Sequence, residues 1–165
     1  MVAGPLGLDV PSNWHVRMGT LNPSGNVAFA YLSPADLPSD CEGPAGGPGV
    51  CYPWPVTELG AGGVVAAIRL HRMPGSQPPT GGDPVTLAGL PARQTSGPAD
   101  SACRSIGGSA LTQVVLPALP NATGWMSLDA CLAGPNPAAA EAVFGVILRS
   151  VVIAADAPSS TPIAS

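Results

Sequence analysis

The sequence predicts an α+β domain with a mainly antiparallel sheet, a long C-terminal helix and a short helix packed on one face. Three observations lead to this prediction. The 165 residues are about the length of one domain. Several strand-length segments alternate apolar and polar residues and are joined by hairpin-like turns. The order along the chain is strands, a short helix, more strands and a final helix.

The first predicted elements are two strands that form a hairpin. Residues 14–18 alternate in polarity, with His15 and Arg17 on the polar side. Residues 22–25 (NPSG) are a turn signal. Residues 26–33 (NVAFAYLS) then predict the second strand.

The middle of the chain combines irregular segments with the strongest strand pattern. Residues 34–62 are rich in Pro and Gly and predict a long loop. Residues 63–72 (GVVAAIRLHR) predict a strand that turns Arg69 and His71 away from its apolar side. Residues 85–87 and 90–95 predict a second hairpin, with Pro91 at an edge or a strand start.

The last third of the chain predicts both helices. Residues 98–106 suit about two helical turns that end at Gly107-Gly108, and strands follow at 111–116 and 125–132. Asn136 and Pro137 suit the start of the final helix. Its apolar positions follow the helical period and are Ala140, Val143, Phe144, Ile147 and Val151. We expect one domain over residues 1–156 and a disordered tail over 157–165.

Four cysteines predict two disulfides, with Cys41–Cys51 and Cys103–Cys131 as the preferred pairing of three. The first would close a Pro/Gly-rich loop, and the second would join the short helix to a late strand. Free or metal-bound thiols are the alternative, but no closely spaced pair suits a zinc site. An even cysteine number in a small domain indicates an oxidising, extracytoplasmic compartment.

Charge and hydropathy exclude several function classes. The formal net charge is −4 and the six cationic residues are all arginines spread along the chain. Binding to nucleic acid or anionic lipid through a basic patch is therefore not expected. No apolar run is long enough to span a bilayer. The start of the chain lacks a signal-peptide pattern, and we interpret the chain as part of a longer precursor with a removed N-terminal anchor.

No motif predicts a catalytic, cofactor or metal site. The only histidines, His15 and His71, both fall on polar strand faces, where solvated side chains are the ordinary interpretation. No G-x-S-x-G elbow is present. Asp36, Asp40 and Glu42 cluster in the Pro-rich loop and are interpreted as solvated charges. We expect no cofactor.

A candidate binding surface is the most specific functional prediction. Tyr52 and Trp54 alternate with prolines directly after Cys51, and stiff aromatic segments suit recognition. A small anion-binding patch could join them; its residues are Arg69, His71 and Arg72. The alternatives are that Trp54 covers the edge of the core and that the patch is a solvated sheet face. Trp14 and Trp125 are expected in the core.

The pattern of elements resembles the PsbP-like fold of photosystem accessory proteins and small bacterial lipoproteins. The matching features are Pro11-x-x-Trp14 before a strand, the hairpin over 85–95 with its Gly89-Leu90-Pro91-Ala92, and the last helix running into Ser150-Val151. The chain also looks like uncharacterised secreted proteins of GC-rich bacteria. The resemblance implies an accessory or binding role and transfers no site residue.

Three functional hypotheses follow. The leading one is a non-catalytic extracytoplasmic module of the bacterial cell envelope that binds another protein or an envelope ligand. The second is an envelope hydrolase with a non-standard site. The third is a structural ectodomain of a larger membrane-anchored protein. A pocket that contains a histidine and a carboxylate would favour the hydrolase, and an exposed Trp54 on a shallow face would favour the module.

Overall fold

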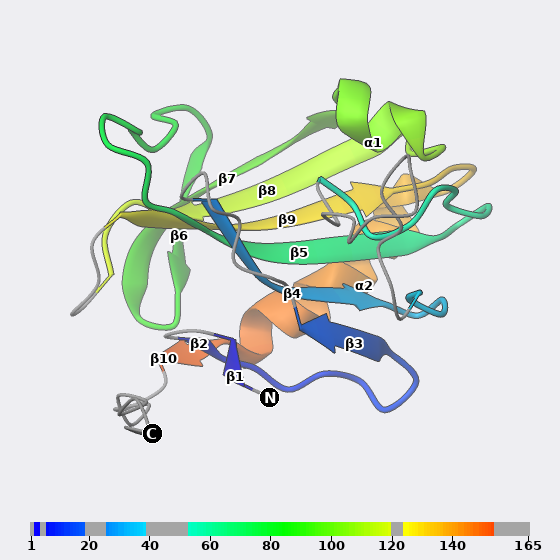
Figure 1. Ribbon diagram of the computed structural model, residues 1–165, viewed down its shortest axis with the longest axis horizontal. Helices are drawn as coiled ribbons and strands as arrows, with labels where there is room; N and C mark the ends of the chain where they lie inside the picture. Colours follow the sequence, from blue (N-terminus) through cyan, green and yellow to red (C-terminus); the bar gives the residue numbers. More distant parts are fainter. Residues whose placement is uncertain (1, 4–5, 19–25, 39–52, 120–123, 154–165) are drawn as a thin grey trace, which may run out of the picture.

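The computed structural model describes residues 2–3, 6–18, 26–38, 53–119 and 124–153 (Figure 1). Its main feature is a seven-stranded sheet in which all neighbouring strands are antiparallel. In sheet order the strands are β3 (His15–Met18), β4 (Asn26–Ser33), β5 (Val64–His71), β9 (Trp125–Leu132), β8 (Ala110–Leu116), β7 (Leu90–Pro98) and β6 (Asp83–Leu87). The mainly antiparallel sheet of the prediction is therefore present.

A second, three-stranded sheet was not predicted. It contains β1 (Val2–Ala3), β2 (Leu6–Gly7) and β10 (Val152–Ile153), with β2 between the other two. Ser150 supports this junction, because its hydroxyl donates to the Asp9 carbonyl at 3.0 Å and accepts from the Asp9 amide. Two-residue strands have no periodicity of their own, so sequence patterns do not reveal them.

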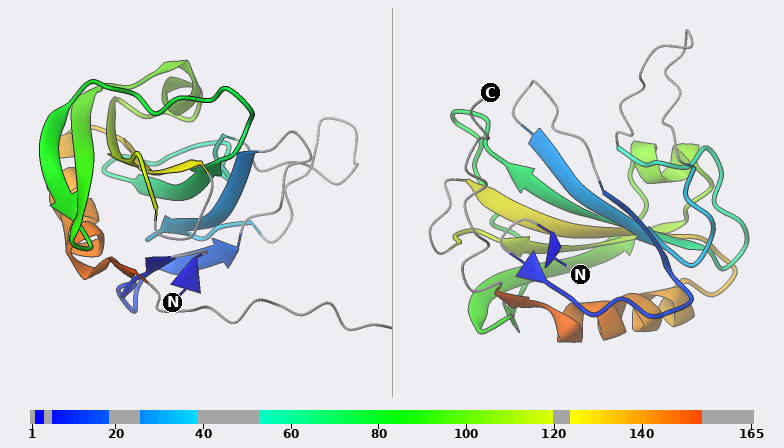
Figure 2. Two further views of the ribbon diagram at one scale, coloured as in Figure 1. Left: turned by 90° about the vertical axis from the view of Figure 1, so that its left-hand side faces the viewer. Right: turned by 60° about the horizontal axis from the view of Figure 1, so that its bottom comes forward.

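The two helices cover opposite faces of the main sheet, which corrects the prediction that both pack on one face (Figures 1 and 2). Helix α2 (Pro137–Ser150) packs against the face that includes Ile68. Helix α1 (Ser101–Ser105) packs on the other face, near Ala67. With 14 residues, α2 is of ordinary length rather than long.

Strand β5 explains how two cores form around one sheet. Its even-numbered residues, Val64 to Leu70, belong to the core beneath α2, together with Phe144 and Ile147. Val65 and Ala67 point the other way, into a smaller core with α1 and Trp54. Because side chains alternate along a strand, a strand covered on both faces reads as nearly continuous apolar sequence.

Most of the local structure that the sequence predicts is present. Asn136 caps α2 by accepting from the Ala139 amide at 3.3 Å. Ala88 and Gly89 both have positive φ in the tight β6–β7 turn, as a twisted two-residue hairpin requires. Val143 is the exception in the predicted apolar stripe, because 41% of it is exposed. The predicted Cys41–Cys51 pair and the tail over 157–165 lie outside the described residues.

Candidate functional site

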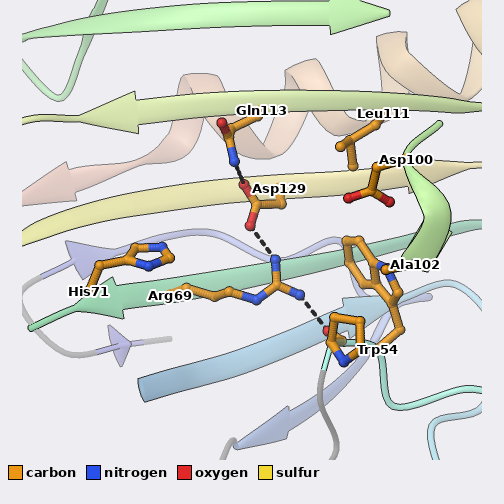
Figure 3. Close-up of a pocket in the computed structure, with 9 residues that line it drawn as sticks. Trp54, Arg69, His71, Asp100, Ala102, Leu111, Gln113 and Asp129 are labelled. Atoms are coloured by element: carbon orange, nitrogen blue, oxygen red, sulfur yellow. Dashed lines mark hydrogen bonds and ion pairs between the residues drawn. The ribbon is translucent and has the colours of Figure 1, made fainter. Parts of the chain in front are cut away.

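A pocket of about 280 Å³ opens on the α1 face of the sheet (Figure 3). Its polar side chains come from the central strands β5, β9 and β8, and its wall comes from the segment before β5 and from the start of α1. The lining residues are Pro53, Trp54, Arg69, His71, Asp100, Ala102, Leu111, Gln113 and Asp129. Segments that lie far apart in the sequence therefore meet at one place on the sheet.

A buried ion pair forms the floor of this pocket. Arg69 on β5 donates through Nη1 to Oδ2 of Asp129 on β9, and both side chains are less than 10% exposed. Nη2 of Arg69 donates to the Pro53 carbonyl, and the guanidinium lies 4.7 Å from the centre of the Trp54 ring. The interpretation of Arg69 as part of a solvated face is therefore wrong. The segment with Pro53 and Trp54 covers the guanidinium, and α1 lies on the same face of the sheet.

Asp129 is held by two further donors. Gln113 on β8 donates its side-chain Nε2 to Oδ1 at 2.8 Å, and Ser127 donates its hydroxyl to Oδ2 at 3.0 Å. A buried ion pair repays its desolvation only when hydrogen bonds surround it well. Asp129 meets this condition, so its carboxylate is fixed in position.

His71 lies at one end of the pocket, half buried. Its ring stacks on Trp125 with 3.6 Å between centroids and 9° between planes, and its Nε2 lies 3.0 Å from the Ser127 hydroxyl oxygen. Burial lowers the pKa of His71, Asp129 acts in the opposite direction, and Arg69 lowers it further. The neutral ring is therefore favoured at neutral pH.

The start of α1 forms the wall opposite His71. Asp100 caps the helix, with Oδ1 accepting from the Cys103 amide at 2.7 Å. The predicted Cys103–Cys131 disulfide is confirmed, and it joins α1 to β9 two residues beyond Asp129. A Cβ on Gly108 would lie 2.3 Å from both sulfur atoms, so only glycine lets the chain after α1 pass over the disulfide.

The structure brings three residues of the predicted surface together and separates the others. Trp54, Arg69 and His71 all line the pocket, whereas Arg72 is exposed and outside its lining. Tyr52 is outside the described residues. Trp54 is buried in the smaller core, as the alternative interpretation held.

The remaining sequence candidates lie elsewhere. His15 is exposed on β3, with Nε2 at 3.2 Å from Oδ1 of the solvated Asp36. Trp14 and Trp125 are buried, as expected. Asp40 and Glu42 are outside the described residues. Within the described ranges, no group of three or more His, Cys, Asp or Glu side chains could hold a metal ion.

Sequence reasoning missed the polar partners of Arg69 and His71. Gln113, Asp129 and Ser127 lie within strands, and Asp100 precedes a short helix. One signal was present: the segment Trp125–Leu132 is apolar on one side, and carries Ser127 and Asp129 at alternate positions on the other. A charged residue in a strand buried along its whole length indicates a partner.

Comparisons with known proteins give no match. No family model matches this chain, and no curated protein or solved structure does so at a significant level.

Proposed function

We propose that this chain is a non-catalytic extracytoplasmic binding module of the bacterial cell envelope, and that the pocket over Arg69 and Asp129 is its binding site. The observation that carries the proposal is the polar floor of this pocket. A buried ion pair costs desolvation and is weak evidence for stability, whereas binding sites need fixed polar groups in a partly apolar cavity.

Two observations favour the hydrolase alternative: His71 shares the pocket with the carboxylates of Asp100 and Asp129, and Trp54 is buried rather than exposed on a shallow face. The direction of the hydrogen bonds weighs against it. In a nucleophilic triad the histidine accepts the serine proton and the carboxylate orients the histidine. Here Ser127 donates to Asp129 instead, and Ser127 is completely buried. A substrate would not reach that hydroxyl.

The extracytoplasmic location rests on the cysteines. The buried Cys103–Cys131 disulfide is compatible with an oxidising compartment. No helix in the described part of the chain has the length and apolar character needed to cross a bilayer. In the third hypothesis, a structural ectodomain, the pocket would have no ligand.

Fragment screening by NMR tests the proposal directly. We would titrate the full ¹⁵N-labelled chain with a library of small polar fragments and follow backbone and indole N–H signals. Saturable shifts that cluster at Trp54, His71 and Gln113 are the expected result. Shifts confined to other surfaces, or none at all, would overturn the proposal.

Gln113→Leu and Gln94→Leu make a matched pair for this screen. Gln113 faces the pocket, whereas Gln94 lines the groove beneath α2 on the opposite face. We expect only Gln113→Leu to weaken fragment binding. Equal weakening by both variants would indicate a general effect on the fold. Release of product from ester, amide or glycoside probes by the unmodified chain would favour the hydrolase.

A further inference from the structure

The direction of the hydrogen bonds in the floor determines what His71 offers to a ligand. An ionised carboxylate only accepts, so the Ser127 proton must point to Asp129. The Ser127 oxygen then accepts from His71, which assigns the ring proton to Nε2. Nδ1 of the neutral ring therefore keeps a lone pair, and it has no hydrogen-bond partner among the described residues. His71, which lines the pocket, therefore carries an acceptor atom without a bond to the described residues.

The same reasoning applies to Gln113. Its side chain lies against Oδ1 of Asp129, so the amide nitrogen must face the carboxylate and the amide oxygen must turn away. Within the described ranges, nothing donates to that oxygen. Gln113 therefore presents a second acceptor.

Asp100 adds a third acceptor and decides the charge of the site. One carboxylate oxygen caps α1, and the other has no bond to any described residue. The charges of Arg69 and Asp129 compensate each other within the floor. Asp100 therefore leaves the pocket with an excess of negative charge, which opposes an anionic ligand. This replaces the expectation of an anion-binding patch around Arg69 and His71.

These acceptors are spread along the pocket. Figure 3 shows His71 at one end, Asp100 beside Trp54 at the other, and Gln113 between them at the side. A ring with several hydroxyl groups offers donors in several directions, whereas one ammonium group offers its donors at a single point. The volume of about 280 Å³ is near the lower limit for small-molecule sites.

We propose that the pocket binds a neutral polyhydroxylated ligand the size of one sugar ring, whose hydroxyl groups donate to His71 Nδ1, Gln113 Oε1 and Asp100. Apolar ring faces of such a ligand would lie against Ala102 and Leu111, which also line the pocket and are partly exposed. This inference rests on the proposed function and specifies its ligand class.

The test is an NMR titration with defined probes. The full ¹⁵N-labelled chain is titrated separately with methyl β-glucopyranoside, myo-inositol, inorganic phosphate and ethanolamine. We expect the two neutral polyols to shift signals of Trp54, His71 and Gln113 in the millimolar range. Phosphate and ethanolamine should leave these signals unchanged.

Asp100→Asn and Asp83→Asn distinguish a specific contact from a general charge effect. Asparagine caps helices as well as aspartate does, so Asp100→Asn keeps α1 in place. Its neutral oxygen accepts more weakly, and we expect polyol affinity to fall about tenfold. Asp83 is exposed at the start of β6, and Asp83→Asn should change the affinity less than twofold.

A second variant tests the same ligand class in case Asp100→Asn disturbs the fold. His71→Phe retains an aromatic ring against Trp125 and removes the Nδ1 acceptor, and it should also weaken polyol binding about tenfold. Phosphate or ethanolamine bound at the pocket in preference to polyols would overturn the ligand class and leave the proposed function standing. If no probe or screening fragment perturbs the pocket, both proposals fail.

Discussion

The two faces of the main sheet differ in what they cover. The face beneath α2 is a continuous apolar core in which Phe144 and Ile147 pack on the even-numbered side of β5. The face beneath α1 is apolar only at one end, around the disulfide, and becomes polar toward Arg69 and His71. The same strand therefore contributes stability on one side and a pocket on the other. The difference teaches that a strand covered on both faces can still line a pocket.

The largest expected effect is on the α2 face. Phe144 is 1% exposed, and Phe144→Ala should lower the free energy of unfolding by about 3–5 kcal/mol, since it removes buried surface and leaves a cavity. Urea denaturation followed by circular dichroism measures the loss. Val143→Ala, at a position half exposed on the same helix, is the control and should cost far less. Equal losses in the two variants would contradict the assignment of Phe144 to the buried side of α2 and Val143 to its exposed side.

The next effect tests whether the polar floor contributes stability or function. Arg69→Met leaves Asp129 charged and buried, and should cost about 3 kcal/mol. The double variant Arg69→Met/Asp129→Leu should recover most of that loss and abolish ligand shifts in the NMR titration. Arg93→Met, at an exposed position on β7, is the control. A double variant no more stable than the single one would show that the ion pair itself stabilises the fold.

Removal of the disulfide should act more on the α1 face than on the α2 face. Cys103→Ala/Cys131→Ala frees a chain segment that the bond closes, and we expect a loss of about 2–4 kcal/mol in the free energy of unfolding. Hydrogen exchange should accelerate in α1 and around Asp100 more than in α2. Uniform acceleration across both helices would mean that the two faces unfold together.

The smallest effect is a pH dependence that originates at His71. Burial lowers its pKa below 6.5 in the folded chain, so the unfolded chain binds the proton more readily. Stability is therefore full above pH 6.5 and falls as the pH decreases through 6.5 toward the folded-state value. His71→Gln should flatten this slope in denaturation curves recorded between pH 5 and 8. His15→Gln, on the exposed strand β3, is the matched control. If it flattened the slope equally, the pH dependence would not originate at His71.

Part of the candidate site could be predicted from sequence. Trp54 was predicted because it alternates with prolines in a stiff aromatic segment, and Arg69 and His71 because they lie on the polar side of a predicted strand. Asp129 and Gln113 were not, because a polar residue within a strand has no local motif. Its partner depends on which strands are neighbours: Arg69 and Asp129 are 60 residues apart and meet only because β5 pairs with β9.

The sequence by itself determined the local structure of this protein. Alternation marked the longer strands, Asn136 and Gly107 marked helix ends, and the even number of cysteines predicted disulfides, with Cys103–Cys131 in the preferred one of three pairings. These signals involve neighbouring residues or overall composition, so they can be recognised in the sequence before the fold is known. Only the tertiary structure decided that α1 and α2 cover opposite faces and that a charged floor lies between them. Those features depend on strand order and register, which bring together groups with no relation along the chain.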